Sequence, residues 1–440
     1  VVDLAENRRD TFINDHFDLS YQGRPGKIIL GEYRKMFRSS KSMLGLILAL
    51  IFVGLVACQG GDSELKIGQI NAYSGSLSFF GESHGNSAKL AADQVMAAGG
   101  PTIVLTHEDT QVNPDVGVEA ARKLVEIDNV AAIVGALSSG VSMAVSSAVT
   151  TPNEVLQISA ASTSPGLTAL NDNDFLFRTT VSDAAQGVVL ARLAKELGYT
   201  TAASLYLNNP YGEGLAGQFK ATFEADGGTV TAQVPHEDEQ PSFTSELTKA
   251  TGEDPDVLIA IGYPGQAQVY LREALEGGYI DNFLFVDGTK SADLFDAVGW
   301  GPFEGMYGTA PGSAENDARN TFNADYKNAF SEAAENPYTA ETYDAVVLIA
   351  LAAEKAGSTT DSIKIRDALR DVSSAPGTVV GPGVDGIKQA IKLIGDGKDI
   401  NYEGAAGSHE FDENGDVAST IEIWEIKGGA ISSTGRFELP

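Results

Sequence analysis

The chain reads VAAIVGALSSG from Val130 to Gly140, and this stretch decides the fold. An apolar, β-branched run stands directly before a loop of small polar residues. An apolar run that does not alternate with polar residues is typical of a strand buried on both faces, as in a parallel sheet. The chain repeats the arrangement as VLQISAASTSP from Val155 to Pro165. Two such units in succession predict βαβ units and an α/β fold.

Strands and helices alternate on both sides of these two stretches. The predicted strands of the first half lie at 65–71, 102–107, 130–136 and 155–161, and the predicted helices between them lie at 87–98, 115–127 and 139–149. The pattern restarts at Ser182, which can cap a helix that carries an apolar stripe and ends at Gly198. We therefore expect two consecutive α/β units, which form two lobes.

The second unit has strands and helices of its own. Its predicted strands lie at 202–207, 229–234, 257–262 and 283–287, separated by helices such as 266–276. Residues 317–397 are predicted to be mainly helical, and residues 419–426 return to strand character. A chain that builds one lobe, then the other, and then adds elements to both crosses between them several times. Several crossings side by side form a hinge.

The N-terminal stretch has the pattern of a processing signal. Residues 43–57 read MLGLILALIFVGLVA without a charge and are followed by Cys58. A transmembrane helix needs about 20 apolar residues, so this run fits the core of a signal peptide instead. The last four residues of the segment, LVAC, resemble the bacterial lipobox, which implies lipidation of Cys58. We expect residues 1–57 to be an artefactual extension plus a lipoprotein signal peptide, and residues 58–64 to be a tether. The alternative is a secretory or core segment with an incidental cysteine.

Composition excludes several classes of protein. The 440 residues include 30 Lys+Arg and 60 Asp+Glu, a net charge of −30, which argues against a basic face for nucleic acid or anionic lipid. Residues 1–57 hold eight basic and six acidic residues, so the rest of the chain has a net charge of −32. Such a charge keeps a surface soluble and is also compatible with saline surroundings. The single cysteine excludes an internal disulfide and a Cys-based zinc site.

Six motifs in order resemble one known family. They read LKIGQINAYSG, VAAIVGALSSG, VLQISAASTSP, FLFRTTVSD, NNPYGEGLAGQF and GSHEFDENGDV. Together they resemble the periplasmic leucine/isoleucine/valine-type binding proteins, which are the substrate-binding components of ABC importers. The resemblance implies a type I periplasmic-binding fold of two Rossmann-like lobes joined by three hinge crossovers. It also implies that residues 65–181 and 312–408 form lobe 1, and residues 182–311 and 409–440 lobe 2.

Two loops of lobe 1 are candidates for binding an anion. Ser138 and Ser139 follow one predicted strand, and Ala161, Ser162 and Thr163 follow the next. Ligands of open α/β sheets bind at the carboxyl ends of strands, where small polar residues ahead of helices can donate hydrogen bonds. In the family these loops hold the α-carboxylate of an amino acid. The resemblance assigns that role to Ser139, the Ala161 backbone and the Thr163 hydroxyl; the alternative is plain helix capping.

The opposite charge of an amino acid needs an acidic partner. The resemblance assigns the ammonium group to Asp287, where leucine-binding members often have Glu, with Tyr263 sharing that duty. Tyr211 matches an aromatic that closes over the ligand. Phe80 and Tyr338 match positions of the side-chain pocket and would favour an apolar or modestly polar side chain. Core packing is the alternative role for both, since aromatic residues in α/β proteins are often buried in the core.

Three stretches match the letters of catalytic or metal-binding motifs but lack the context that such motifs require. Residues 212–217 spell GxGxxG, but four residues separate them from the preceding strand, so we predict a loop of lobe 2 at the cleft and no nucleotide cofactor. Residues 81–85 spell GxSxG, for which we predict a loop leading into the helix at 87–98. The acidic turn at 412–416 lacks the Gly and Glu that a calcium loop requires, and the five histidines lack metal-ligand spacing.

The sequence thus predicts a non-enzymatic receptor without cofactor or metal. We expect a lipid-anchored, extracytoplasmic monomer that binds an amino acid, branched-chain or otherwise apolar, and delivers it to an ABC permease. One alternative is a receptor for an amide, urea or another small polar solute. Another is a lipoprotein that senses its ligand without transport, and a third is an enzyme that uses the GxGxxG as a cofactor site.

Overall fold

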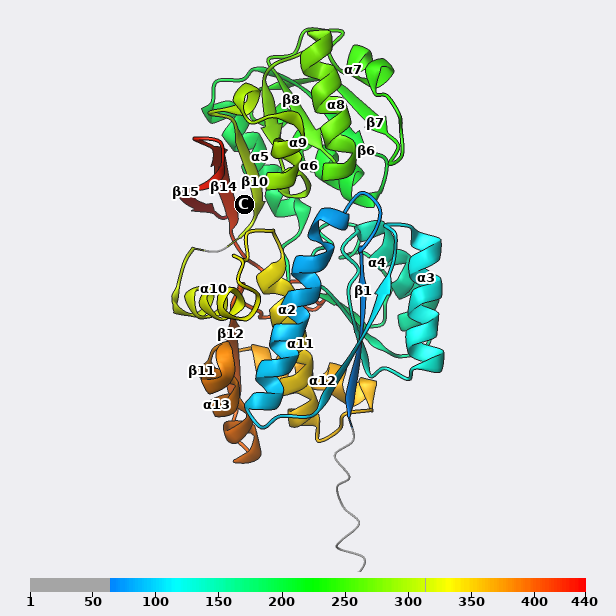
Figure 1. Ribbon diagram of the computed structural model, residues 1–440, viewed down its shortest axis with the longest axis vertical. Helices are drawn as coiled ribbons and strands as arrows, with labels where there is room; N and C mark the ends of the chain where they lie inside the picture. The colour runs from blue at the N-terminus through cyan, green and yellow to red at the C-terminus, as the bar shows by residue number, and fades with distance from the viewer. Residues whose placement is uncertain (1–63, 313) are drawn as a thin grey trace, which may run out of the picture. The chain divides into compact units, whose positions relative to one another are not determined.

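A parallel sheet of five strands forms the centre of the first lobe (Figure 1). The computed structural model describes residues 64–312 and 314–440, so the predicted signal peptide and Cys58 lie outside the described residues. The strand order is β2-β1-β3-β4-β5, and every neighbouring pair is parallel. The strands are β1 (Leu65–Asn71), β2 (Ile103–Asp109), β3 (Ala132–Val134), β4 (Leu156–Ser159) and β5 (Leu176–Arg178). The quoted stretches are therefore neighbouring strands, as predicted.

Helices cover this sheet and complete its core. They are α2 (Ser78–Ala97), α3 (Pro114–Arg122), α4 (Ser139–Val145), α10 (Asp317–Phe330), α11 (Thr339–Ala356), α12 (Ser362–Ser373) and α13 (Gly383–Gly395). Helices α2 and α11 lie side by side (Figure 1), and α11 is buried along nearly its whole length. A small sheet of β11 (Thr378–Val380), β12 (Ile400–Gly404) and β13 (Gly407–Ser408) follows. The mainly helical prediction for residues 317–397 is confirmed.

A second sheet of seven strands, in the order β15-β14-β10-β9-β8-β6-β7, forms the other lobe. The strands are β6 (Thr201–Leu207), β7 (Thr229–His236), β8 (Val257–Ile261), β9 (Phe283–Phe285), β10 (Tyr307–Pro311), β14 (Ile421–Ile426) and β15 (Ile431–Glu438). The helices are α5 (Asp183–Glu196), α6 (Pro210–Ala225), α7 (Thr244–Ala250), α8 (Pro264–Gly277) and α9 (Ala292–Val298). The strands β6 to β10 are parallel, whereas β14 pairs antiparallel with both β10 and β15.

The chain crosses between the two sheets three times, after β5, after β10 and after β13. The second and third crossings are joined directly. Gly312 N donates to Thr420 O at 3.1 Å, and Thr420 Oγ1 donates to Gly312 O at 2.6 Å. These crossings are the hinge of the predicted type I periplasmic-binding fold. No helix in the described part of the chain combines the length and apolar character needed to cross a membrane.

Both glycine motifs lie in helices, which corrects two predictions. Gly81–Gly85 belongs to α2 and Gly212–Gly217 to α6, where loops were predicted. Close backbone approach explains the glycines, since a Cβ on Gly81 would lie 2.4 Å from Ala72 O and one on Gly212 would lie 2.1 Å from Leu207 O. Asn209 caps α6 through its side chain and Pro210 occupies the first turn. The motifs therefore let helices begin close to strand ends.

Candidate functional site

A small cavity of about 20 Å³ lies where the carboxyl ends of strands from both sheets meet. Its lining residues are Leu77, Phe80, His84, Leu137, Ser139, Ala161, Tyr211, Tyr263, Asp287, Gly288 and Tyr338. Ligand cavities typically measure about 300–1,000 Å³, so this cavity must widen to hold a small molecule. Seven of the ten residues that the sequence assigned to ligand binding are brought together here. The other three are Ser138, Ser162 and Thr163, which belong to the same two loops.

Asp287 is the acidic group of the cavity. It begins a 3-10 turn, Asp287–Thr289, directly after β9, and its side chain is 3% exposed. Its Oδ1 accepts hydrogen bonds from Tyr211 Oη and Gln186 Nε2, both at 2.9 Å, and its Oδ2 accepts from Tyr338 Oη at 2.6 Å. Burial raises the pKa of this carboxyl, and the hydrogen bonds from Tyr338 and Tyr211 act against that rise.

Asp183 is a second buried carboxylate that the sequence analysis missed. It is the first residue of α5, and its side chain is fully buried. Burial, and then the nearby charge of Asp287, raise the pKa of Asp183 well above its usual range. An acid in the first turn of a helix is common, because it favours the helix dipole. The sequence alone therefore does not show whether Asp183 is buried or exposed. Its burial near Asp287 is seen only in the folded structure, where α5 carries it there.

Asp287 gives the cavity a preference for positive charge. Among the described residues that line it there is no Lys or Arg. A buried carboxylate that lacks a partner is costly, and a ligand ammonium would supply both charge and hydrogen-bond donors. The side chain of Thr163 is also buried, and its hydrogen bond with Asp183 opposes the rise in the pKa of Asp183. The arrangement thus offers acceptors for a cationic group that the protein itself does not provide.

The two serine- and threonine-containing loops stand at the ends of β3 and β4. Ser139 begins α4, and its Oγ accepts a hydrogen bond from Ser164 N at 3.2 Å, so one loop supports the other. Ser138 Oγ accepts from Tyr263 Oη at 3.4 Å. Ser162 turns its hydroxyl away from the cavity, toward Ser142 Oγ at 2.8 Å and Ala136 O at 3.1 Å. Its side chain therefore shapes the loop and does not line the cavity.

Aromatic and apolar side chains form the rest of the lining. Tyr211 and Tyr263 stack with ring centroids 5.5 Å apart and an interplanar angle of 12°. Phe80 is buried on α2, and Tyr338 precedes α11 in the left-handed backbone region, at φ 66°. Tyr338 reaches Asp287 through its hydroxyl, so it belongs to the acidic end of the cavity as well as to the pocket wall.

The Periplasmic binding protein family model matches residues 64–403. The chain belongs to the periplasmic binding protein family. This confirms the family resemblance of the six sequence motifs. The match covers the elements that carry all of the cavity residues named above.

Relatives of this periplasmic binding protein cover most of its length. The chain is 29% identical to the Leu/Ile/Val-binding protein BraC3 of Rhizobium johnstonii, over 77% of this chain and 92% of that one. It is 28% identical to the chemotactic signal transduction system substrate-binding protein BasB of Halobacterium salinarum, over 76% of this chain and 79% of that one. The crystal structure of the leucine-binding protein LivK of Thermotoga maritima matches with a TM-score of 0.72 and 25% identity, covering 85% and 97%.

His84 lines the cavity of this binding protein and contacts the segment that carries Tyr338. Its Nδ1 lies 2.8 Å from Thr342 Oγ1, and its Nε2 lies 3.1 Å from Pro337 O. Burial lowers the pKa of His84 to about 4, so the ring is neutral at ordinary pH. The imidazole thus fixes both ends of the segment that carries Tyr338. Sequence analysis considered the histidines only as metal ligands and did not find this role.

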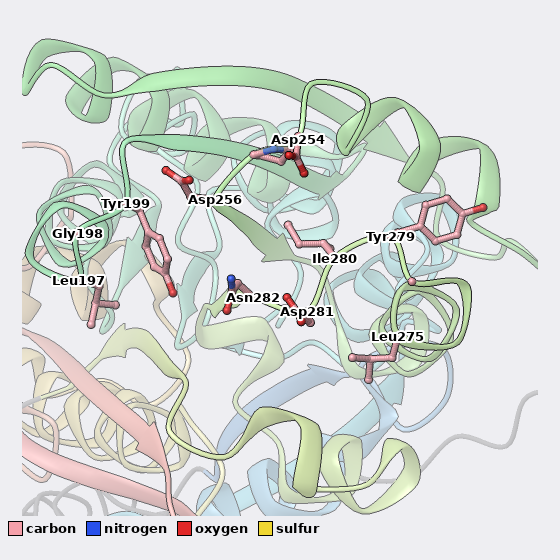
Figure 2. A pocket seen from close by; sticks show the side chains of 12 residues that line it. Leu197, Gly198, Tyr199, Asp254, Asp256, Leu275, Tyr279, Ile280, Asp281 and Asn282 are labelled. Carbon is pink, nitrogen blue, oxygen red and sulfur yellow. The ribbon is translucent and has the colours of Figure 1, made fainter.

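A second hollow lies in the other lobe, at the starts of β6, β8 and β9 (Figure 2). It is lined by polar side chains such as Asp254, Asp256 and Asp281 together with Tyr199 and Tyr279. Asp256 Oδ2 accepts hydrogen bonds from the backbone of Thr200 and Thr201, which lower its pKa to about 2. Open α/β sheets bind ligands at the carboxyl ends of strands, whereas this hollow is at the amino ends. The first cavity is therefore the candidate ligand site.

Proposed function

We propose that the chain is the extracytoplasmic substrate-binding protein of an ABC importer for an amino acid with an apolar side chain. The observation that carries the proposal is the buried carboxylate of Asp287 in a small cavity that Ser139 and Ala161 also line. An amino acid presents one anionic and one cationic group to such a site. The names of BraC3 and LivK, which describe leucine binding, support the same class of ligand.

The carboxylate of the ligand binds the loops of the first lobe in this proposal. Ser139 Oγ, the Ala161 backbone and the Thr163 hydroxyl donate to it at the ends of β3 and β4. The ammonium group donates to Asp287. Both attractions strengthen as the lobes close and exclude water, because charges interact more strongly at low dielectric. Closure is then favoured by ligand contacts that only the closed form makes.

The apolar part of the cavity determines the side chain of the ligand. Leu77, Phe80 and Leu137 are apolar side chains of the described lining. Burying a leucine-sized side chain among such residues contributes about 1.5–3 kcal/mol. We therefore propose a branched-chain or similarly apolar amino acid.

The remaining parts of the proposal concern the chain's setting. We infer that Cys58 is lipidated and anchors a monomer outside the cytoplasm, that the permease receives the ligand, and that the protein is not an enzyme. We also infer that lobe 1 comprises residues 65–181 and 312–408, and lobe 2 residues 182–311 and 409–440. Mass spectrometry of the protein from its native membrane tests the anchor, since a lipidated N-terminal Cys58 has a distinct mass.

A thermal-shift panel tests the substrate class. Purified protein is heated with each of the standard amino acids and with amides and urea. We expect leucine, isoleucine or valine to raise the melting temperature most, because a ligand that binds only the folded form stabilises it. A response to amides or urea alone would support the alternative receptor for small polar solutes and contradict the proposal.

A second candidate function is ligand sensing without transport. It is favoured by the relative BasB, whose name describes a substrate-binding protein of chemotactic signal transduction. Deleting the gene separates the two functions. Loss of radiolabelled amino-acid uptake indicates transport, whereas intact uptake with loss of movement toward the amino acid indicates sensing.

A further inference from the structure

Arg178 is a buried cation at the end of β5. Its side chain is 1% exposed, and it lies beside the loop at 161–164 that follows β4. Its Nη1 donates to Ser164 O at 3.0 Å and to Ser162 O at 3.4 Å. Its Nη2 donates to Thr168 Oγ1 at 2.7 Å. One guanidinium thus contacts the loop at two carbonyl groups.

Asp416 holds this guanidinium from the third crossing of the hinge. The contact is bidentate, with Arg178 Nε to Oδ1 at 2.5 Å and Nη2 to Oδ2 at 2.7 Å. Thr168 Oγ1 also donates to Oδ2, at 2.7 Å. The backbone fixes the same arrangement, since Arg178 N donates to Gly415 O at 3.0 Å. The acidic turn at 412–416 therefore has a partner inside the protein.

The orientation of one peptide group links this pair to the ligand site. The carbonyl of Ser162 and the N–H of Thr163 belong to one planar peptide and point in opposite directions. Because Arg178 binds that carbonyl, the N–H of Thr163 is directed away from the guanidinium. It donates to no group among the described residues. The loop thus keeps a backbone donor free beside the buried Thr163 hydroxyl.

We infer that Arg178 and Asp416 are positioning residues that hold the 161–164 loop in the shape that binds the ligand's carboxylate. The inference rests on the proposed function, because it assumes a ligand carboxylate at this loop. It also gives the acidic turn at 412–416 a role in binding, although the turn does not line the cavity. Arg is suited to the task, since its planar fork binds a carboxylate and two carbonyl oxygens at once.

The test compares two ligands with two variants. Leucine and leucinamide share the ammonium group and side chain, but leucinamide lacks the charged carboxylate. Arg178→Lys keeps the charge and loses the fork. We expect it to weaken leucine binding by about tenfold and leucinamide binding by less than about threefold, in isothermal titration calorimetry. Thr168→Val removes only a hydroxyl that contacts both Arg178 and Asp416. It should also weaken leucine binding more than leucinamide binding, and it provides the test if Arg178→Lys does not fold.

The matched control is Arg436→Lys. Arg436 Nη2 lies 2.8 Å from Glu196 Oε2 and its Nε lies 3.1 Å from Glu438 Oε1, in the other lobe and away from the loop. We expect both affinities to stay within about twofold of the wild type. Equal losses for leucine and leucinamide, or no loss for leucine in either variant, would overturn the inference while leaving the proposed function intact. A wild-type protein that binds no amino acid would overturn the proposed function and this inference with it.

Discussion

Asp287 is a buried carboxylate held by three neutral donors, from Tyr211, Gln186 and Tyr338. Sequence resemblance identified the residue, but its environment comes from the fold. Gln186 lies on α5, the other two on α6 and before α11, and no local pattern joins these elements. Asp183 was missed for the same reason. A titratable residue can be recognised as a candidate site residue only when its neighbours in the fold are known, and those neighbours are distant in sequence.

Replacing Asp287 tests the acidic end of the site. We expect Asp287→Asn to weaken leucine binding by about 3 kcal/mol, about 100-fold, because the amide keeps the hydrogen-bonding shape and loses the charge. Calorimetry measures the affinity, and circular dichroism checks the fold. Asp256→Asn, in the hollow of Figure 2, is the control that should leave leucine affinity unchanged. Equal affinities for wild type and Asp287→Asn would remove this residue from the site.

Two buried histidines predict how stability depends on pH. Burial lowers the pKa of both His84 and His409 to about 4, against about 6.5 in the unfolded chain. Between these values the unfolded state binds more protons, so these residues lower the free energy of unfolding as pH falls from 6.5 toward 4. Asp344 acts in the opposite direction, because burial raises its pKa to about 6. Its native state takes up the proton first and gains stability as pH falls below 6.

Urea unfolding at pH 7 and pH 5 measures the histidine effect. We expect His84→Gln to reduce the loss of stability between the two pH values by about 1–2 kcal/mol, since glutamine cannot titrate. The comparison is between slopes, so a general loss of stability in the variant does not disturb it. An unchanged difference between pH 7 and pH 5 would show that His84 is not the titrating group.

At the scale of elements, the sequence predicted long, strongly patterned segments well and short ones poorly. Buried strands such as β1 and β8 were predicted nearly to the residue. The strand β5 has three residues and was missed, because so short a run shows no hydrophobic periodicity. The first half of α2 was missed because two glycines, Gly81 and Gly85, interrupt its pattern. Glycine marks a loop in a sequence, but here it allows close packing against β1 and the loop after it.

The glycines of α6 give a test of that explanation. A Cβ on Gly212 would lie 2.1 Å from Leu207 O, whereas a Cβ on Gly217 would meet nothing within 4 Å. We expect Gly212→Ala to lower the free energy of unfolding by about 2–3 kcal/mol through overpacking. Gly217→Ala, in the same helix, should raise it by about 0.5–1 kcal/mol through helix propensity. Urea unfolding measures both, and similar stabilities for the two variants would contradict the close-approach explanation.

At the scale of the whole molecule, two sheets and three crossings place one cavity between side chains of both lobes. Ordered motifs along the chain were enough to predict this architecture, and the family match confirms it. Side chains of one lobe contact the other beside the cavity, as in Ser164 Oγ to Pro210 O at 2.7 Å and Ser76 Oγ to Asp238 Oδ2 at 3.0 Å. The ligand is therefore expected to stabilise both lobes together.

Hydrogen exchange tests that expectation. With leucine at about 100 times its Kd, the free energy of unfolding should rise by about 2.7 kcal/mol. Amides at the starts of α4 and α6 should both exchange more slowly, because they lie on opposite sides of the cavity. Exposed amides around Asp254 serve as the internal control and should not change. Protection confined to α4 would contradict closure of the second lobe over the ligand.

The central claim is that the cavity recognises an amino acid through both of its charged groups. Calorimetry with leucine and with 4-methylpentanoate tests it most directly, because the two share the side chain and the carboxylate and differ in the ammonium group. Asp287 has only neutral hydrogen-bond donors around it when the ammonium is missing. We predict that leucine binds and that 4-methylpentanoate binds at least about 100-fold more weakly. Equal affinity for the two, or binding of 4-methylpentanoate alone, would contradict the account.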